Sequence, residues 1–178
     1  MTFNDFQLHE DILKAIDELG FEECTDVQSR TLSESLSGRD VAVQSQTGTG
    51  KTAAFLITIF HLLLSDERFS GKQALIVAPT RELAVQIEKD AQDIGKHLPY
   101  RTVTIYGGVG YKGQETRLRE GVDIIIATPG RLLDLEQSKT LRFDDIAVLD
   151  TALNDQAVHG YYSAARAMLG NAANRDDG

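Results

Sequence analysis

Short apolar runs separated by polar segments follow one another along most of the chain. They occupy residues 40–45, 74–79, 101–106, 123–128 and 145–150, and each run has the length of a single strand. In the segments between them, apolar residues recur every three or four positions, which is the spacing of a helix. This alternation predicts an α/β fold, in which a parallel β-sheet is flanked by helices.

The helical spacing is clearest in the first hundred residues. Helices are predicted over residues 12–19, 25–36, 51–64 and 81–98, and shorter ones before Gly121 and from Pro129 onward. Gly20 is a stop signal for the first helix, and Thr80 is a candidate cap for the fourth.

Composition limits the possible function classes. The chain has 178 residues, of which 42% are apolar, and a formal net charge of -9. An acidic chain does not grip nucleic acid by a broad basic face, although a groove of backbone amides and a few arginines stays possible. Cys24 is the sole cysteine, and neither a signal peptide nor a membrane-spanning run is found. We therefore expect a cytoplasmic protein that does not contact a membrane.

The pattern changes after Asp150. We expect one domain over residues 1–150 and an atypical, alanine-rich tail over residues 151–178. Residues 161–169 could form one amphipathic helix, followed by a disordered end.

A phosphate-binding loop is predicted where the first apolar run meets a helix. Glycines there allow the backbone to approach phosphates, the Lys51 ammonium adds a charge, and the Thr52 hydroxyl can join a Mg²⁺ shell. The residues expected to hold the nucleotide are Ser45, Gln46, Thr47, Gly48, Thr49, Gly50, Lys51 and Thr52. Ser45 stands where this pattern normally begins with glycine, and the alternative is an ordinary glycine-rich turn.

Asp150, at the end of the last apolar run, is the candidate second ligand for Mg²⁺. Ligands gather at the carboxyl ends of parallel strands, where the phosphate loop also begins. The alternative is a strand-end aspartate that faces solvent. Thr52 and Asp150 are therefore the predicted metal residues.

Further motifs lie on both sides of the phosphate loop. GFEECTDVQ, residues 20–28, is similar to the adenine-sensing Q motif of DEAD-box RNA helicases, and Phe3 stands at its upstream aromatic position. PTRELA (79–84), Gly107-Gly108 and TPGR (128–131) are similar to the RNA-contacting motifs, and VLD (148–150) to the start of the DEAD motif. The resemblance implies an N-terminal RecA-like domain of the P-loop NTPase class, which binds ATP with Mg²⁺ and part of an RNA strand.

Two residues of the Q motif keep a structural alternative. The Gln28 amide can donate to and accept from an adenine edge at once, but it can also fold back on Thr25 as a capping box. Phe3 could stack near the adenine, although a lone aromatic near a terminus is often a core residue. Cys24 and Asp26 stand where the motif usually has prolines.

The RNA contacts implied by the resemblance are mostly to phosphates. The residues involved are Pro79, Thr80, Arg81, Glu82, Gly107, Gly108, Thr128, Pro129, Gly130 and Arg131. Arg81 and Arg131 can reach phosphates, and the glycines present backbone N–H groups. Binding of single-stranded or duplex RNA is then sequence-tolerant and salt-sensitive. The alternatives are a solvated first turn at Arg81-Glu82 and a plain turn at Gly107-Gly108.

The DEAD motif itself is altered. Thr151 occupies the position of the general-base glutamate and cannot accept a proton near neutral pH, so no catalytic residue is secure. Leu153 replaces the last aspartate, the Ser-Ala-Thr motif has only a weak imitation at residues 163–165, and the second RecA-like domain with its arginine finger is not among these residues. We expect a truncated or rearranged helicase that binds ATP with little hydrolysis and no unwinding. The alternatives are a non-catalytic nucleotide- or RNA-binding module, which could serve a protein partner, and a defective truncation product.

Overall fold

A computed structural model describes residues 1–151, with side chains through Asp150. These residues form two compact units. The first contains residues 1–71 and 89–100, and the second contains residues 72–88 and continues from residue 101. The predicted tail helix at residues 161–169 lies outside the described residues.

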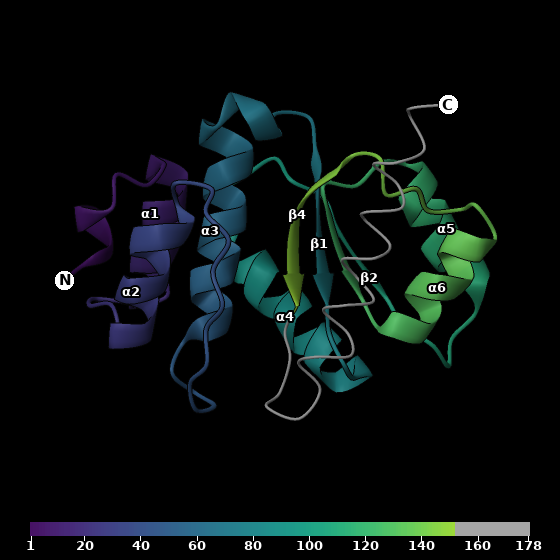
Figure 1. The fold of residues 1–178 in the computed structure, drawn as a ribbon, viewed down its shortest axis with the longest axis horizontal. Coiled ribbons are helices and arrows are strands. Elements are labelled where there is room, and N and C mark those ends of the chain that lie inside the picture. The colour runs from purple at the N-terminus through teal and green to yellow at the C-terminus, as the bar shows by residue number, and fades with distance from the viewer. Residues whose placement is uncertain (152–178) are drawn as a thin grey trace. The chain divides into compact units, whose positions relative to one another are not determined.

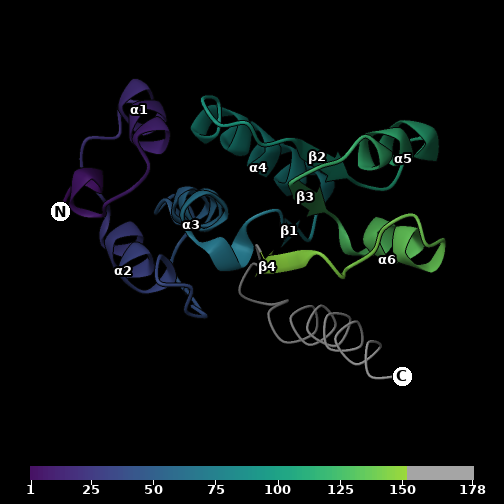
Figure 2. The same ribbon diagram turned by 90° about the horizontal axis from the view of Figure 1, so that it is seen from above.

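The first unit is built from helices around α3 (Lys51–Ser65). Both views show α1 (Glu10–Glu18) and α2 (Asp26–Ser35) beside α3 (Figures 1 and 2). Short 3-10 turns, η1 (Phe3–Asp5) and η2 (Glu67–Phe69), complete the unit. These helices confirm the three predicted from spacing over residues 12–19, 25–36 and 51–64. None of the helices within residues 1–151 combines the length and the apolar character needed to cross a bilayer.

The second unit contains a four-stranded parallel sheet. Its strands are β1 (Gln73–Val77), β2 (Thr102–Ile105), β3 (Ile124–Ala127) and β4 (Ile146–Thr151), in the order β2-β3-β1-β4. Helices α5 (Tyr111–Arg119) and α6 (Pro129–Gln137) belong to this unit. The sheet and its helices confirm the predicted α/β class.

One face of this sheet carries an apolar core. Alternate residues of three strands point to it, because side chains along a strand change face at every position. The cluster contains Leu75, Val77, Val103, Ile105, Ile125 and Ala127 from the strands, and Leu132, Leu135, Leu141 and Phe143 from α6 and the segment after it. The spacing of Leu132 and Leu135 places both on the covered face of α6. The core fixes the carboxyl ends of β1, β2 and β3 at one edge, where the predicted RNA motifs begin.

The prediction of a strand over residues 40–45 is wrong. These residues form no strand, and Val41 and Val43 instead line a hollow with Val27 and Arg30 of α2. An apolar run suits a strand only when a neighbouring strand supplies hydrogen bonds, and no described strand pairs with this segment. The structure therefore has four described strands where the pattern predicts five.

The helix predicted over residues 81–98 is shorter than expected. Helix α4 (Arg81–Ile94) begins as predicted, with the Thr80 hydroxyl accepting a 3.2 Å hydrogen bond from the Leu83 N–H. It ends before Gly95, which is followed by a turn in which the Leu98 N–H donates to the Gly95 carbonyl. Glycine is a common helix terminator, and the apolar Leu98 extended the apparent periodicity past it.

Candidate nucleotide and nucleic-acid sites

The predicted phosphate loop, residues 45–52, continues into the first turn of α3. Gly48 has φ +83° and Gly50 has φ +84°, which is the left-handed region that glycine adopts without a steric cost. Gly50 is the N-cap of α3, so the first free N–H groups of the helix follow directly. The loop therefore places backbone donors and the positive end of a fifteen-residue helix beside Lys51 and Thr52.

The polar groups of this loop bind one another. The Lys51 Nζ donates to the Ser45 carbonyl and, at 3.3 Å, to the Gln46 carbonyl. The Ser45 and Thr49 hydroxyls lie 2.7 Å apart, and the Thr49 hydroxyl donates to the Gln46 carbonyl at 2.9 Å. A triphosphate entering the loop must exchange with these internal hydrogen bonds.

The Q-motif residues lie against the same loop. The Gln28 Oε1 accepts from the Thr25 N–H at 3.0 Å, and the Thr25 hydroxyl accepts from the Gln28 N–H at 3.2 Å, so the capping box forms. The Gln28 Nε2 also donates to the Gly50 carbonyl at 3.4 Å, and the Thr25 hydroxyl donates to the Thr49 carbonyl at 2.8 Å. With 6% exposure, Gln28 is a structural residue that also faces the loop. Its contact with adenine stays a prediction.

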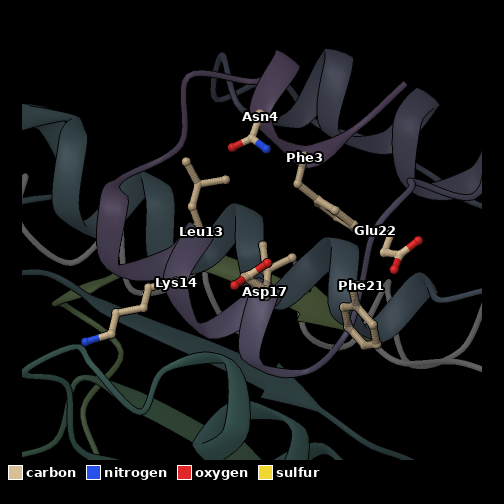
Figure 3. A pocket seen from close by; sticks show the side chains of 8 residues that line it. Phe3, Asn4, Leu13, Lys14, Asp17, Phe21 and Glu22 are labelled. Carbon is tan, nitrogen blue, oxygen red and sulfur yellow. The ribbon is translucent and has the colours of Figure 1, made fainter.

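Phe3 is a core residue of the first unit. Its side chain is 2% exposed, and its ring stacks on that of Phe21 with centroids 6.3 Å apart. The two rings border a hollow of about 330 Å³, which Leu13 and Asp17 of α1 also line (Figure 3). The structural alternative for Phe3 is thus the one formed, and its stacking on adenine stays a prediction.

The three predicted RNA motifs all follow strands of the second unit. Pro79, Thr80 and Arg81 follow β1, Gly107 and Gly108 follow β2, and residues 128–131 follow β3. Because these strands are parallel neighbours, the motifs share one edge of the sheet. Arg81 and Glu82 are exposed in the first turn of α4, and Gly107 and Gly108 are exposed as well. The sheet therefore brings together segments that lie far apart in the sequence.

Arg131 is unlike Arg81 in its surroundings. Its side chain is only 7% exposed, and its guanidinium donates to the Val109 carbonyl at 2.9 Å and to the Gln114 Oε1 at 3.4 Å. The exposed Arg81 instead lies over the ring of Tyr106, 4.7 Å from the centroid. The predicted phosphate contact of Arg131 is untested, and its present partners show that it holds the segment after Gly108.

Sequence reasoning missed two residues that join these motifs, Gln114 and Tyr111. The Gln114 Nε2 donates to the Tyr106 carbonyl at 3.1 Å, directly before Gly107. Tyr111 stacks on Arg131, 3.9 Å from guanidinium to ring centroid, and its hydroxyl donates to Asp134 at 3.0 Å. This hydrogen bond to a carboxylate raises the pKa of Tyr111. The available signal in the sequence was a pair of tyrosines, Tyr106 directly before Gly107-Gly108 and Tyr111 three residues after it.

Asp150 and Thr151 end β4. They pair in register with Ile76 and Val77 of β1, so Asp150 lies at the same sheet edge as the RNA motifs and is partly buried. No three His, Cys, Asp or Glu side chains among those described gather into a metal site. Mg²⁺ commonly takes only one or two protein carboxylates beside substrate phosphates, and that is the arrangement predicted for Thr52 and Asp150. Leu153 and residues 163–165 lie outside the described residues.

A parallel α/β unit with motifs at its strand ends, together with a glycine-rich loop that opens a helix, is the arrangement found in P-loop NTPases. A match to the DEAD/DEAH box helicase family covers residues 25–156, and the chain belongs to that family. It is 48% identical over 160 residues to the "ATP-dependent RNA helicase RhlB" of Xanthomonas axonopodis pv. citri, which covers 85% of this chain and 28% of the relative. The protein of the same name from Pasteurella multocida is 47% identical over 152 residues, covering 84% of this chain and 36% of the relative.

A solved structure supports the fold assignment. A "hypothetical ATP-dependent RNA helicase from Sulfolobus tokodaii" is similar with a TM-score of 0.81 and 37% identity, over 94% of this chain and 48% of that one. The chain spans about a third of the length of the curated relatives it matches. The family is therefore established for this chain, whereas the activity of a whole helicase is not.

Proposed function

We propose that this chain binds ATP with Mg²⁺ through residues 45–52, hydrolyses it slowly, and contacts RNA through the motifs at the sheet edge. The observation that carries the nucleotide proposal is the loop itself, in which two left-handed glycines lead into an apolar helix whose first residue is Lys51. Thr52 and Asp150 are the residues that we expect to hold Mg²⁺, and Gln28 is the expected reader of adenine. Family membership supports the choice of ATP as the nucleotide.

Slow hydrolysis follows from the altered DEAD motif. A positioned general base contributes about 10²–10⁴ to the rate of proton transfer steps, and the threonine hydroxyl at position 151 cannot supply one. The chain would then act by holding nucleotide rather than by turning it over. Thr151 is also the observation that favours the second candidate, a non-catalytic nucleotide-binding module.

The test is a thermal melt with and without Mg-ATP. Binding to the folded state alone raises the stability by about 2.7 kcal/mol at a ligand concentration of 100 times Kd. We expect Mg-ATP to raise the melting temperature of the unaltered chain, and Lys51→Ala to abolish the rise. Lys89→Ala removes an exposed lysine of α4 and is the matched control, which should keep the rise. An equal rise in Lys51→Ala and Lys89→Ala would contradict binding at the loop.

RNA binding is tested separately by fluorescence anisotropy with labelled oligouridylate. The proposed contacts are to phosphates, so affinity should fall steeply as salt increases. Arg81→Ala should weaken binding, because it removes an exposed cation beside the turn after β1. Affinity that is insensitive to both salt and Arg81→Ala would exclude this surface as the RNA site.

A further inference from the structure

We propose that the ring of Tyr111 stacks against one base of the RNA strand whose phosphates lie along the turn after β2. This inference rests on the proposed RNA binding and deepens it, because the contacts predicted from the sequence are mostly to phosphates and none is to a base. A base contact at Tyr111 would add a second kind of interaction to the same surface.

The first observation is that Tyr111 is exposed and yet held in place. It is the first residue of α5 and is 44% exposed, the one exposed aromatic side chain among the described residues of the second unit. Its hydroxyl is fixed on Asp134, and the Arg131 guanidinium lies over the ring. A ring held at two points loses little conformational freedom on binding, which makes it a good platform for a flat ligand.

The second observation concerns Arg131, the residue stacked on the ring. Arg131 is buried and is itself anchored on the Val109 carbonyl and on Gln114, which in turn donates to the Tyr106 carbonyl. The same network therefore supports both Tyr111 and the turn that contains the exposed Gly107 and Gly108. A strand that meets the amides of this turn arrives next to the ring.

The local charges favour a base over a phosphate at the ring. Asp134 lies 3.0 Å from the Tyr111 hydroxyl, and Glu115 also acts on this tyrosine. The Arg131 cation acts in the opposite sense, but its guanidinium is already bound to the Val109 carbonyl and to Gln114. These two carboxylates repel a phosphate at this point but carry no such penalty for a neutral base. The exposed Lys112 follows Tyr111 and provides a cation for the neighbouring phosphate.

The structural alternative is that Tyr111 only shields Arg131. Shielding and stacking both need the ring, so loss of the ring alone does not separate them. They differ in their dependence on bases: a shield affects every ligand of the turn equally, whereas a platform acts only on a ligand that has bases. An abasic oligoribonucleotide supplies the phosphates without the bases.

The experiment compares labelled oligouridylate and an abasic oligomer of equal length by anisotropy, using the full chain. Tyr111→Ala should weaken oligouridylate binding about 5- to 100-fold, as expected for loss of one stacked base, and leave the abasic oligomer unchanged. Tyr111→Phe keeps the ring and should bind within about twofold of the unaltered chain. Val85→Ala removes an exposed apolar side chain of α4 and is the control for general surface effects.

A second measurement covers the case in which Tyr111→Ala fails to fold. The chain contains no tryptophan, so Tyr111→Trp places a single emitter at the ring position. Its emission should be quenched by oligouridylate and not by the abasic oligomer, with Val85→Trp as the control. Equal loss of both oligomers in Tyr111→Ala, or equal quenching by both, would overturn stacking while leaving phosphate binding intact. Failure of the unaltered chain to bind either oligomer would overturn the RNA proposal and this inference with it.

Discussion

The phosphate loop offers a matched pair of glycines for a stability test. Gly48 and Gly50 have almost the same backbone, with φ +83° and φ +84°. A side chain at Gly48 would meet nothing within 4 Å, whereas one at Gly50 would lie 2.3 Å from the Gln28 Nε2 and 2.9 Å from its Cδ. Gly48→Ala therefore reports backbone strain alone, and Gly50→Ala reports the same strain plus the contact with Gln28.

The expected magnitudes follow from this difference. A left-handed alanine costs about 1–2 kcal/mol, which both variants share. The Gln28 amide is the end of a flexible side chain and would move away from the new methyl group, giving up its hydrogen bonds to the Thr25 N–H and the Gly50 carbonyl. Loss of these two bonds costs Gly50→Ala about a further 1–3 kcal/mol, at about 0.5–1.5 kcal/mol for each bond. In a chain of this size, each kcal/mol lowers the melting temperature by about 2–4 °C.

Denaturant unfolding of six proteins, the two parents and the four glycine variants, measures the extra cost. Gly48→Ala and Gly50→Ala are each made in the unaltered chain and in a Gln28→Ala background, which forms a double-mutant cycle. Gly50→Ala should be the more damaging change in the unaltered chain, and the two should become equal once Gln28 is shortened. Equal costs in the unaltered chain, or a difference that survives in the Gln28→Ala background, would refute the proposed contact.

Two further predictions concern pH and turnover. Burial lowers the pKa of His61, whose Nδ1 has no hydrogen-bond partner among the described residues, so the unfolded chain takes up a proton first. The contribution of His61 to stability should therefore be greatest above about pH 6.5 and fall as the pH drops below it. Urea midpoints of His61→Gln should depend less on pH than those of the unaltered chain, and an identical pH dependence of the two proteins would contradict this. Thr151→Glu should increase phosphate release from Mg-ATP, by as much as about 10²-fold, and adding Lys51→Ala should cancel the increase. An unaltered chain that already hydrolyses ATP as fast as Thr151→Glu would show that water is activated in another way.

The helices of the first unit were predictable because their signals are local. The apolar spacing of α1 and the cap at Thr25 act over a few residues, and both are found where expected. The strand at residues 40–45 was not predictable in the same way, since a strand depends on a partner that the local pattern does not specify. Four other apolar runs have such partners and form the sheet.

The candidate sites show the same contrast between features that have a local sequence signal and features that depend on distant partners. The positions of the motifs at strand ends follow from the order of strands and helices, which the sequence does reveal. The surroundings of individual side chains do not follow from that order. An arginine in a predicted RNA motif has the same local sequence signal whether its side chain is exposed, as in Arg81, or buried, as in Arg131. Tyr111 and Gln114 escaped notice because their roles arise from the contact with Arg131 and not from a local pattern.

The internal hydrogen bonds of the phosphate loop set a limit on its affinity. Lys51 is already bound to the Ser45 and Gln46 carbonyls, so a phosphate gains only the difference between the new contacts and these. Gln28 faces a similar exchange, because its Nε2 must leave the Gly50 carbonyl to reach a base, while its Oε1 serves the cap of α2. In the proposed complex, adenine and phosphates would each replace hydrogen bonds that meet at one short segment, Thr49 to Lys51. We expect a nucleotide that breaks one set to weaken the other, because both sets meet at this segment. A base without phosphates, or phosphates without a base, should therefore bind more weakly than the whole nucleotide.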